Sequence, residues 1–348
     1  MKKLLVGCLF LAGSFLHAQA NDLESWTDAY IAGLAPTQHF RGNVLVERDG
    51  HTVLKKSYGL ADESWHVPNA TDGCFEIASI TKQFTAVAIL QLAESGKLSV
   101  QDPVSKLYSQ APASWRGITV QQLLTHTSGL PNNELKDFNK GIAAPYTAEE
   151  LIQTFRNRPL VAAPGTKWAY TNTEYYLLAY IIEQLSGQFY GTYLSKHIFN
   201  PLGMANSGFV SSLTIVPRMA EGYTREGGTL RRHDYFDRSL EIGAGGIHTS
   251  LDDLVRWNHA LDTPGFLKAE SLKQMFSVHP PGNYGYGWFI DDKPIRRIYH
   301  EGGDPGFAAF EARYPDEHVL IVVLANEDDA PVRDLSVAIA KHLGLNTP

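Results

Sequence analysis

The stretch SITKQFTAVAILQLAESG, residues 79–96, places a serine and a lysine at the start of a predicted helix. Apolar residues recur through Phe84, Val87 and Leu90 until Gly96 ends the pattern, which is typical of a helix. Ser79 and Lys82 are three residues apart, so they share one helical face. A lysine there can accept the serine proton, and the helix N-terminus can stabilise an anionic intermediate. The spacing alone equally fits a serine that caps the helix beside a solvated lysine.

A second element, Tyr170-Thr171-Asn172, follows Ser79 by 91 residues and directly precedes a helical pattern from Glu174 to Leu185. A phenol near a lysine can act as acid and base, and an amide can hold a substrate carbonyl or amide. Two structural interpretations remain open at this point. Asn172 could cap its helix, and Tyr170 could be an ordinary half-buried aromatic residue.

A third element, His300-Glu301-Gly302-Gly303, follows Tyr170 by 130 residues and succeeds a predicted strand at 296–299. Glycine lets another backbone or a substrate approach closely, and the N–H of Gly303 can point into a site. The patterns S-x-x-K, Y-x-N and H-x-G-G each occur once, in that order. Together they predict a nucleophilic active site.

Strand patterns lie at both ends of the chain. Asp49 and Gly50 join two β-type runs at 44–46 and 53–54, which is a hairpin signal. Aromatic or β-branched runs follow near the C-terminus, at 284–290, 296–300, 308–314 and 319–325, before a predicted helix at 332–343. Residues 80–280 are dominated by helical periodicity. The sequence therefore predicts an antiparallel sheet assembled from both ends around a central helical insertion, with no repeat or linker that would separate two domains.

The composition is that of a globular protein, since 44% of the 348 residues are hydrophobic and 19% are charged. This excludes a disordered tail, a collagen-like fibre and a small disulfide scaffold. Residues 1–20 carry Lys2 and Lys3, then an apolar run over 4–16 and a small-x-small end at Ala20. We interpret them as a secretory signal peptide cleaved after Ala20. The run is shorter than the ~20 residues that cross a bilayer, so we expect an exported protein, periplasmic or secreted, with no stable membrane anchor after cleavage.

Cleavage would remove two lysines and no acid, changing the formal net charge from −7 to −9. A basic surface for nucleic acid is therefore not expected. Of the two cysteines only Cys74 would remain, so the mature chain can form no intramolecular disulfide, and we expect Cys74 to be a small buried residue.

Several signatures of other hydrolases and of cofactor binding are absent from the sequence. It has no G-x-S-x-G, no H-E-x-x-H and no Walker-type loop, and its glycine clusters lack the Rossmann spacing. His126 and His248 lack a third ligand at metal spacing. We expect neither a cofactor nor a metal.

Further motifs accompany the three elements: LLTHTSGLP at 123–131, a Pro164-Gly165 turn, a glycine-rich segment at 243–250 and the run at 302–307. With them, the sequence resembles the penicillin-recognising serine hydrolases. The branch in question contains class C β-lactamases, a D-Ala-D-Ala carboxypeptidase, esterases and D-aminopeptidases. The resemblance covers nearly the whole mature chain, and it is specific for the superfamily rather than for a substrate.

The resemblance implies an α/β (α+β) fold of the beta-lactamase/transpeptidase type, in which helices flank an antiparallel sheet beside a mostly helical lobe. Residues 21–348 would form one domain, with a sheet lobe at about 21–75 and 284–348 and a helical lobe at about 76–283. Ser79 would be the acylated nucleophile, Lys82 its proton acceptor or electrostatic partner, and Tyr170 the acid and base. The resemblance further implies three substrate-binding residues and an oxyanion hole of two backbone N–H groups: Asn172, His300 and Gly302 for the substrate, Ser79 and Gly303 for the oxyanion.

The third motif departs from the lysine-threonine-glycine of class C β-lactamases. His300 has an ordinary pKa near 6.5, so we expect it to attract a substrate carboxylate more strongly at pH 6 than at pH 8. Glu301 would oppose an anionic group if it faced the groove, but strand alternation can turn it away.

The sequence thus predicts an exported serine hydrolase that forms an acyl-enzyme on a small-molecule or short-peptide ester or amide. An esterase or amidase ranks first, a D-amino-acid peptidase or DD-carboxypeptidase second, and a dedicated β-lactamase third. The alternative from another functional class is a catalytically silent cell-wall-binding protein, because a protein can keep a fold after losing the catalytic activity associated with it.

Overall fold

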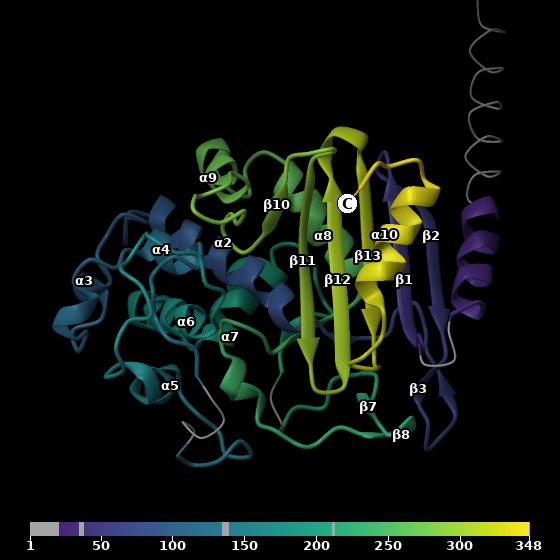
Figure 1. The fold of residues 1–348 in the computed structure, drawn as a ribbon, viewed down its shortest axis with the longest axis horizontal. Coiled ribbons are helices and arrows are strands. Elements are labelled where there is room, and N and C mark those ends of the chain that lie inside the picture. The colour runs from purple at the N-terminus through teal and green to yellow at the C-terminus, as the bar shows by residue number, and fades with distance from the viewer. Residues whose placement is uncertain (1–20, 35–37, 134–138, 211–212, 348) are drawn as a thin grey trace, which may run out of the picture.

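A six-stranded antiparallel sheet takes two strands from the beginning of the chain and four from its end (Figure 1). The computed structural model describes residues 21–34, 38–133, 139–210 and 213–347. The strand order is β10-β11-β12-β13-β1-β2, and β1 pairs with β13 so that Val44 lies opposite Val323. The strands are β1 (Gly42–Arg48), β2 (His51–Tyr58), β10 (Phe289–Asp291), β11 (Arg297–Asp304), β12 (Phe307–Tyr314) and β13 (Val319–Ala325). The predicted fold class is confirmed.

The rest of the chain forms helices and short strand pairs. The helices are one at 21–32, α2 (Thr81–Glu94), α3 (Val104–Leu107), α4 (Val120–Leu124), α5 (Ala148–Phe155), α6 (Thr173–Ser186), α7 (Tyr190–Leu194), α8 (Leu251–Asp262), α9 (Ala269–Met275) and α10 (Val332–His342). The short strands are β3 (Leu60–Asp62), β4 (Val67–Pro68), β5 (Phe75–Glu76), β6 (Gly208–Phe209), β7 (Tyr223–Glu226), β8 (Thr229–Arg232) and β9 (Ile247–Thr249). Helices α2 to α7 gather beside the sheet, whereas α10 lies across it (Figure 1).

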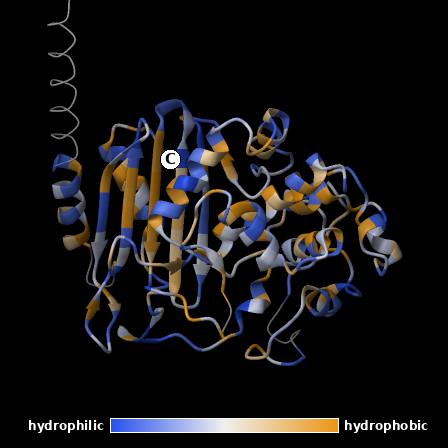
Figure 2. Ribbon diagram, turned by 180° about the vertical axis from the view of Figure 1, so that it is seen from behind, coloured by the Kyte–Doolittle hydropathy of each residue, from blue (hydrophilic) through white to orange (hydrophobic). Residues whose placement is uncertain are grey.

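The sheet is covered on both faces, and its central strands are hydrophobic along most of their length (Figure 2). Every residue of β12 and β13 is buried. Successive side chains of a strand point to opposite faces of the sheet, so each strand contributes side chains to two cores. Val322 packs in a large core with α2, α6 and α8, whereas Val323 packs in a smaller core with α10 and the helix at 21–32.

Local signals in the sequence account for several element boundaries. Asp49 and Gly50 form the turn between β1 and β2 and both have positive φ, 52° and 75°, as a tight hairpin requires. Ser250 caps α8, because its side chain accepts a hydrogen bond from the N–H of Asp253. Cys74 is buried, as expected.

The predicted strand at 284–290 is wrong over most of its length, because only Phe289–Asp291 pairs in the sheet. Gly287 adopts a φ of 79° and the N–H of Gly285 donates to the carbonyl of Trp288, so the chain turns tightly here. The turn buries the aromatic side chains that gave the segment its strand-like pattern, those of Tyr284, Tyr286 and Trp288.

Within the described ranges, no helix has the length and apolar character required to span a membrane. The predicted signal peptide, residues 1–20, lies outside the described residues.

Candidate active site

Ser79 lies on a strained turn that leads into α2. The turn, Ala78–Ile80, is a short 3-10 helix, and Ala78 has a φ of 46°, which non-glycine residues rarely adopt. Such a backbone costs on the order of 1–3 kcal/mol and persists only where its surroundings hold it. Here the N–H of Ile77 donates to the carbonyl of Ile247 at 2.9 Å. Ser79 is thereby presented at the edge of a cavity while its neighbours are buried.

The amine of Lys82 is fully buried behind Ser79. Its Nζ lies 3.0 Å from Ser79 Oγ, 2.9 Å from Asn172 Oδ1 and 2.9 Å from the carbonyl oxygen of Ala244. Three partners within hydrogen-bond distance fix the amine in one place beside the serine hydroxyl. The alternative of a solvated lysine on a helix surface is therefore wrong.

Burial also changes the acidity of Lys82. Desolvation disfavours the ammonium form and lowers the pKa of Lys82 to about 7, although the charges of Glu241, Asp304 and Glu174 oppose the shift. An amine with that pKa exists substantially in its neutral form at neutral pH. Lys82 can therefore accept a proton from Ser79.

The aromatic ring of Tyr170 lies close to the amine of Lys82. Lys82 Nζ lies 4.8 Å from the centre of the Tyr170 ring, and the Tyr170 hydroxyl oxygen is buried without a hydrogen-bond partner of normal geometry. Burial raises the pKa of Tyr170 well above its usual value, and the Ser79 hydroxyl opposes a part of that shift. The phenol is thus neutral in the resting site and available as a proton donor.

Asn172 occupies the N-cap position of α6 but makes no side-chain capping bond. Its side-chain oxygen instead accepts from Lys82. The capping interpretation of Asn172 is therefore wrong, and this amide connects the second motif to the first.

The third motif brings β11 against the turn that carries Ser79. A Cβ added to Gly302 would lie 2.2 Å from the carbonyl oxygen of Ile77, so only glycine fits at this approach. A Cβ added to Gly303 would meet nothing within 4 Å, which leaves this backbone open to the cavity. The cavity has a volume of about 620 Å³ and is lined by all three motifs, through Ser79, Tyr170, His300, Gly302 and Gly303.

The expected role of His300 as a titrating cation is not supported by its environment. His300 reaches the cavity wall but is only 1% exposed. Its Nε2 lies 2.8 Å from Tyr284 Oη and its Nδ1 lies 2.6 Å from the carbonyl oxygen of Glu301. Burial, aided by the nearby charge of Lys82, lowers the pKa of His300 to about 3. The ring is therefore neutral throughout pH 6–8, and it can contribute hydrogen bonding and shape but no positive charge.

Glu301 points away from His300, as alternation along a strand requires. It is exposed, and its carboxylate forms a two-point ion pair with Arg333 at the start of α10. The pair lies on the wall of the same cavity.

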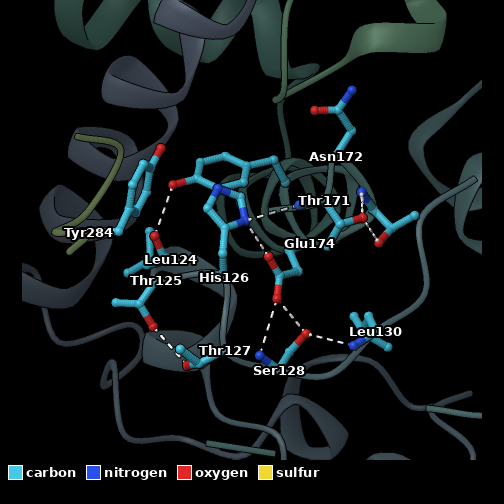
Figure 3. Close-up of polar contacts among 12 residues, drawn as sticks. Leu124, Thr125, His126, Thr127, Ser128, Leu130, Thr171, Asn172, Glu174 and Tyr284 are labelled. Atoms are coloured by element: carbon cyan, nitrogen blue, oxygen red, sulfur yellow. Dashed lines mark hydrogen bonds and ion pairs between the residues drawn. The ribbon is translucent and has the colours of Figure 1, made fainter. Parts of the chain in front are cut away.

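A buried network that surrounds Glu174 and His126 was not assigned from the sequence (Figure 3). Glu174 on α6 lies 2.5 Å from His126 Nδ1 and accepts from both the N–H and the hydroxyl of Ser128. The His126 ring lies 4.3 Å from the ring of Tyr170, measured between centres. The network therefore ties the segment at 123–131 to the helix that follows Tyr170 and Asn172. Two features of the sequence could have revealed this network: the LLTHTSGLP motif and the acidic residue two positions after Asn172.

Asn172 also lines a second cavity of about 630 Å³. Glu241, Asp234 and Asp328 line it, together with Arg231 and His233. Glu241 also lies close enough to Lys82 to influence its pKa. The two cavities share one lining residue, Asp328, so they adjoin each other there.

No group of three potential metal ligands occurs among the residues that the structure describes. His126 is engaged with Glu174, and His248 is buried with a pKa lowered to about 4.

The fold and these contacts define the class of this protein. A serine beside a buried lysine, a phenol over that lysine and a glycine strand against the serine turn make it a serine hydrolase of the fold shared by β-lactamases and penicillin-binding proteins. The family model described as "Beta-lactamase" matches residues 25–345. The chain belongs to the beta-lactamase family, and the resemblance inferred from its motifs is confirmed.

Relatives and solved structures agree with this assignment. Penicillin-binding protein 4* of Bacillus subtilis is 30% identical over 344 residues, covering 90% of this chain and 74% of that protein. Protein flp of Staphylococcus aureus is 30% identical over 355 residues, covering 94% and 68%. The crystal structure of a penicillin-binding protein from Bacillus halodurans is 27% identical, with a TM-score of 0.78 over 94% of this chain and 98% of the other. An octameric penicillin-binding protein homologue from Pyrococcus abyssi is 29% identical, with a TM-score of 0.80 over 94% and 78%.

Proposed function

We propose that this protein is an exported serine hydrolase, related to the class C branch, that forms an acyl-enzyme on an ester or amide. The observation that supports this most directly is the 3.0 Å distance between Ser79 Oγ and the buried amine of Lys82. Lys82 accepts the serine proton as Oγ attacks the substrate carbonyl carbon. The N–H groups of Ser79 and Gly303 stabilise the oxyanion. The leaving group then departs with a proton supplied through Tyr170, and water releases the acyl group.

The substrate ranking rests on the form of the third motif. With His300 neutral and Glu301 paired, the cavity offers no ammonium to a substrate carboxylate, in contrast to a lysine-threonine-glycine motif. We therefore rank a broad esterase or amidase first and a dedicated β-lactamase last. EstCE1, a hydrolase with promiscuous acyltransferase activity, shares the fold with a TM-score of 0.76 at 19% identity.

A D-amino-acid amidase or peptidase is the second candidate. The observation that favours it is the pair of carboxylates on the wall of the second cavity, Asp234 and Asp328, which could receive a substrate ammonium. The D-amino acid amidase of Ochrobactrum anthropi shares the fold with a TM-score of 0.80 at 22% identity.

Labelling with a fluorophosphonate tests the proposed chemistry. Ser79 Oγ would bond to phosphorus with loss of fluoride, and mass spectrometry would show one adduct on Ser79. The Ser79→Ala variant is the control and should remain unlabelled. A folded wild-type protein without an adduct would instead support the cell-wall-binding alternative.

A panel of p-nitrophenyl esters, D-amino-acid amides, D-Ala-D-Ala peptides and nitrocefin would test the substrate ranking. The highest kcat/KM is expected for the esters. Nitrocefin turnover far above ester turnover would overturn the ranking.

Export is proposed from residues 1–20 alone. Expression of the full chain in a bacterium should deliver a mature protein whose first residue is Asn21, as read by N-terminal sequencing. A mature protein that retains Lys2 and Lys3 would contradict the predicted cleavage.

A further inference from the structure

The cavity beside Ser79 has an unbalanced charge. Among the described residues that line it, Arg333 is the one cationic side chain, whereas Glu301, Asp328 and Asp334 are acidic. A substrate carboxylate entering this cavity would therefore meet three like charges and depend on a single arginine for attraction.

That arginine is already engaged. Arg333 Nε lies 3.0 Å from Glu301 Oε2 and Arg333 Nη2 lies 2.7 Å from Glu301 Oε1. This two-point geometry engages the Nε–Nη2 side of the guanidinium, one of the two sides through which an arginine can bind a carboxylate as a bidentate partner. The side chains of Arg333 and Glu301 are 52% and 48% exposed, so the pair contributes little to folding and can be altered without unfolding the protein.

The Glu301–Arg333 ion pair lies close to Gly303, whose N–H we propose as part of the oxyanion hole. Glu301 and Gly303 are two residues apart on β11, and both belong to the exposed side of the strand, whereas His300 and Gly302 belong to the buried side. Because Glu301, Gly303 and Arg333 also line the same cavity, a substrate whose carbonyl oxygen reaches the N–H of Gly303 occupies the cavity that contains the ion pair.

We propose that the Glu301–Arg333 ion pair is a specificity gate that disfavours carboxylate-bearing esters and amides and admits neutral and cationic ones. Glu301 acts in two ways: it occupies the guanidinium, and it repels an incoming anion. Discrimination by a built-in repulsive charge does not require any new attractive contact to the preferred substrate. This inference rests on the proposed hydrolase function and names the class of substrate for that site.

The test uses three aryl acetates that differ only in the charge of one meta substituent: a carboxylate, a carboxamide and a trimethylammonium group. A second series carries the same three substituents on the acyl side. The quantity compared is the ratio of kcat/KM for the anionic ester to that for the neutral ester. In Glu301→Gln this ratio should rise about tenfold, because the arginine is freed and the repulsion is removed. In Arg333→Gln the ratio should fall, and the double variant should lose most of the gain of Glu301→Gln.

Asp252→Asn is the matched control. Asp252 forms a comparable half-exposed ion pair with Lys55 on β2, at the opposite edge of the sheet from β10 and β11. Its replacement removes one negative charge from the protein in the same way, so it should leave the ratio unchanged. An equal change in the control would show that net charge, rather than the gate, controls the ratio.

The outcomes separate this inference from the function on which it rests. If wild type hydrolyses the neutral ester but Glu301→Gln leaves the ratio unchanged in both series, the gate is wrong and the hydrolase assignment stands. If wild type hydrolyses none of the esters and Ser79 is not labelled, the proposed function fails and the gate with it.

Discussion

The amine of Lys82 differs from that of a surface lysine because it is fully buried and its three hydrogen-bond partners are groups of the protein. It is held between Ser79, Asn172 and Ala244, and burial lowers its pKa to about 7. Tyr170 is shifted in the opposite direction, so its phenol keeps its proton. These opposite displacements of the two pKa values fit the roles that we propose, proton acceptor for Lys82 and proton donor for Tyr170.

The pH dependence of kcat/KM for a neutral ester should therefore follow Lys82. The acceptor must be unprotonated, so kcat/KM should be low below pH 6, rise with a midpoint near pH 7 and level off above pH 8. The Lys82→Arg variant should be inactive, since a guanidinium keeps its proton at neutral pH and cannot accept one from Ser79. A profile that is flat from pH 5.5 to 9 would show that Lys82 does not act as the base.

Replacement of Tyr170 by phenylalanine should separate chemistry from folding. The hydroxyl has no hydrogen-bond partner of normal geometry, so its removal leaves no buried group unpaired and the thermal midpoint should change little. The value of kcat/KM should fall ~10²-fold or more, the scale for loss of a positioned acid or base. Ser79→Ala should abolish acylation altogether. Equal and mild losses in both variants would contradict the assigned roles.

Single residues also mark the limit of sequence reasoning. The motifs located Ser79 and Lys82 because a separation of three residues brings their side chains together where the turn at 78–80 continues into α2. The state of His300 depends instead on its burial, and one of the groups around it is Tyr284, which reaches Nε2 of the ring from a turn 16 residues earlier. Burial produced by such a turn leaves no periodic signal, so the expected ordinary pKa of His300 was wrong.

Among the elements, the approach of β11 to the serine turn determines whether the site is assembled. The close contact between Gly302 and the carbonyl of Ile77 sets the distance between the nucleophile and the strand that carries Gly303. Since the two segments are joined only through packing, a side chain inserted between them would separate the N–H groups of Ser79 and Gly303 that we propose as the oxyanion hole.

Adjacent glycines provide a matched test of this contact. Gly302→Ala places a Cβ 2.2 Å from a backbone oxygen and should destabilise the protein by about 1–3 kcal/mol, the range for an overpacked interior. It should also lower kcat by displacing β11. Gly303→Ala meets nothing within 4 Å and should retain wild-type stability. Urea unfolding and kcat would be measured for both variants, and equal stability losses would rule out the close approach as the cause.

Element prediction succeeded where the local pattern and the tertiary environment agree. Residues 319–325 form an uninterrupted apolar run because both faces of this strand are buried, and residues 308–314 keep a strand pattern although Glu311 and Arg313 occur within it. At 284–290 the aromatic residues follow a strand-like pattern, yet the glycines at 285 and 287 allow a turn that buries these side chains in a different way. The role of Glu174 was missed for a related reason, because its partners lie on a segment more than forty residues earlier in the chain.

At the scale of the whole molecule, the sheet separates two cores with different relations to the site. The larger core contains Phe84 on α2, which stacks on Trp257 at 4.1 Å between ring centres. The smaller core contains Ile339 on α10, on the opposite face of the sheet. Both side chains are fully buried.

Truncation of either side chain should therefore cost similar stability but unequal activity. Phe84→Ala and Ile339→Ala should each lose about 2–5 kcal/mol of unfolding free energy, the usual cost of a large-to-small change in a core. Only Phe84→Ala should also lower kcat at temperatures where both variants are folded, because Phe84 lies on the helix that carries Lys82. If Ile339→Ala lost more kcat than Phe84→Ala, the smaller core would be the one that controls the geometry of the site, and the prediction would be wrong.

The sheet that joins both ends of the chain also has a consequence for synthesis. Ser79 leaves the ribosome 224 residues before Gly303, and β1 leaves it long before its neighbour β13. At about 5–20 residues per second, the nucleophile waits on the order of ten seconds or more without its strand, while one edge of the β1–β2 hairpin stays unpaired. The nascent chain is therefore inert as a catalyst and exposed to aggregation over the same interval. Activity and protection of that edge both arrive with the last fifty residues.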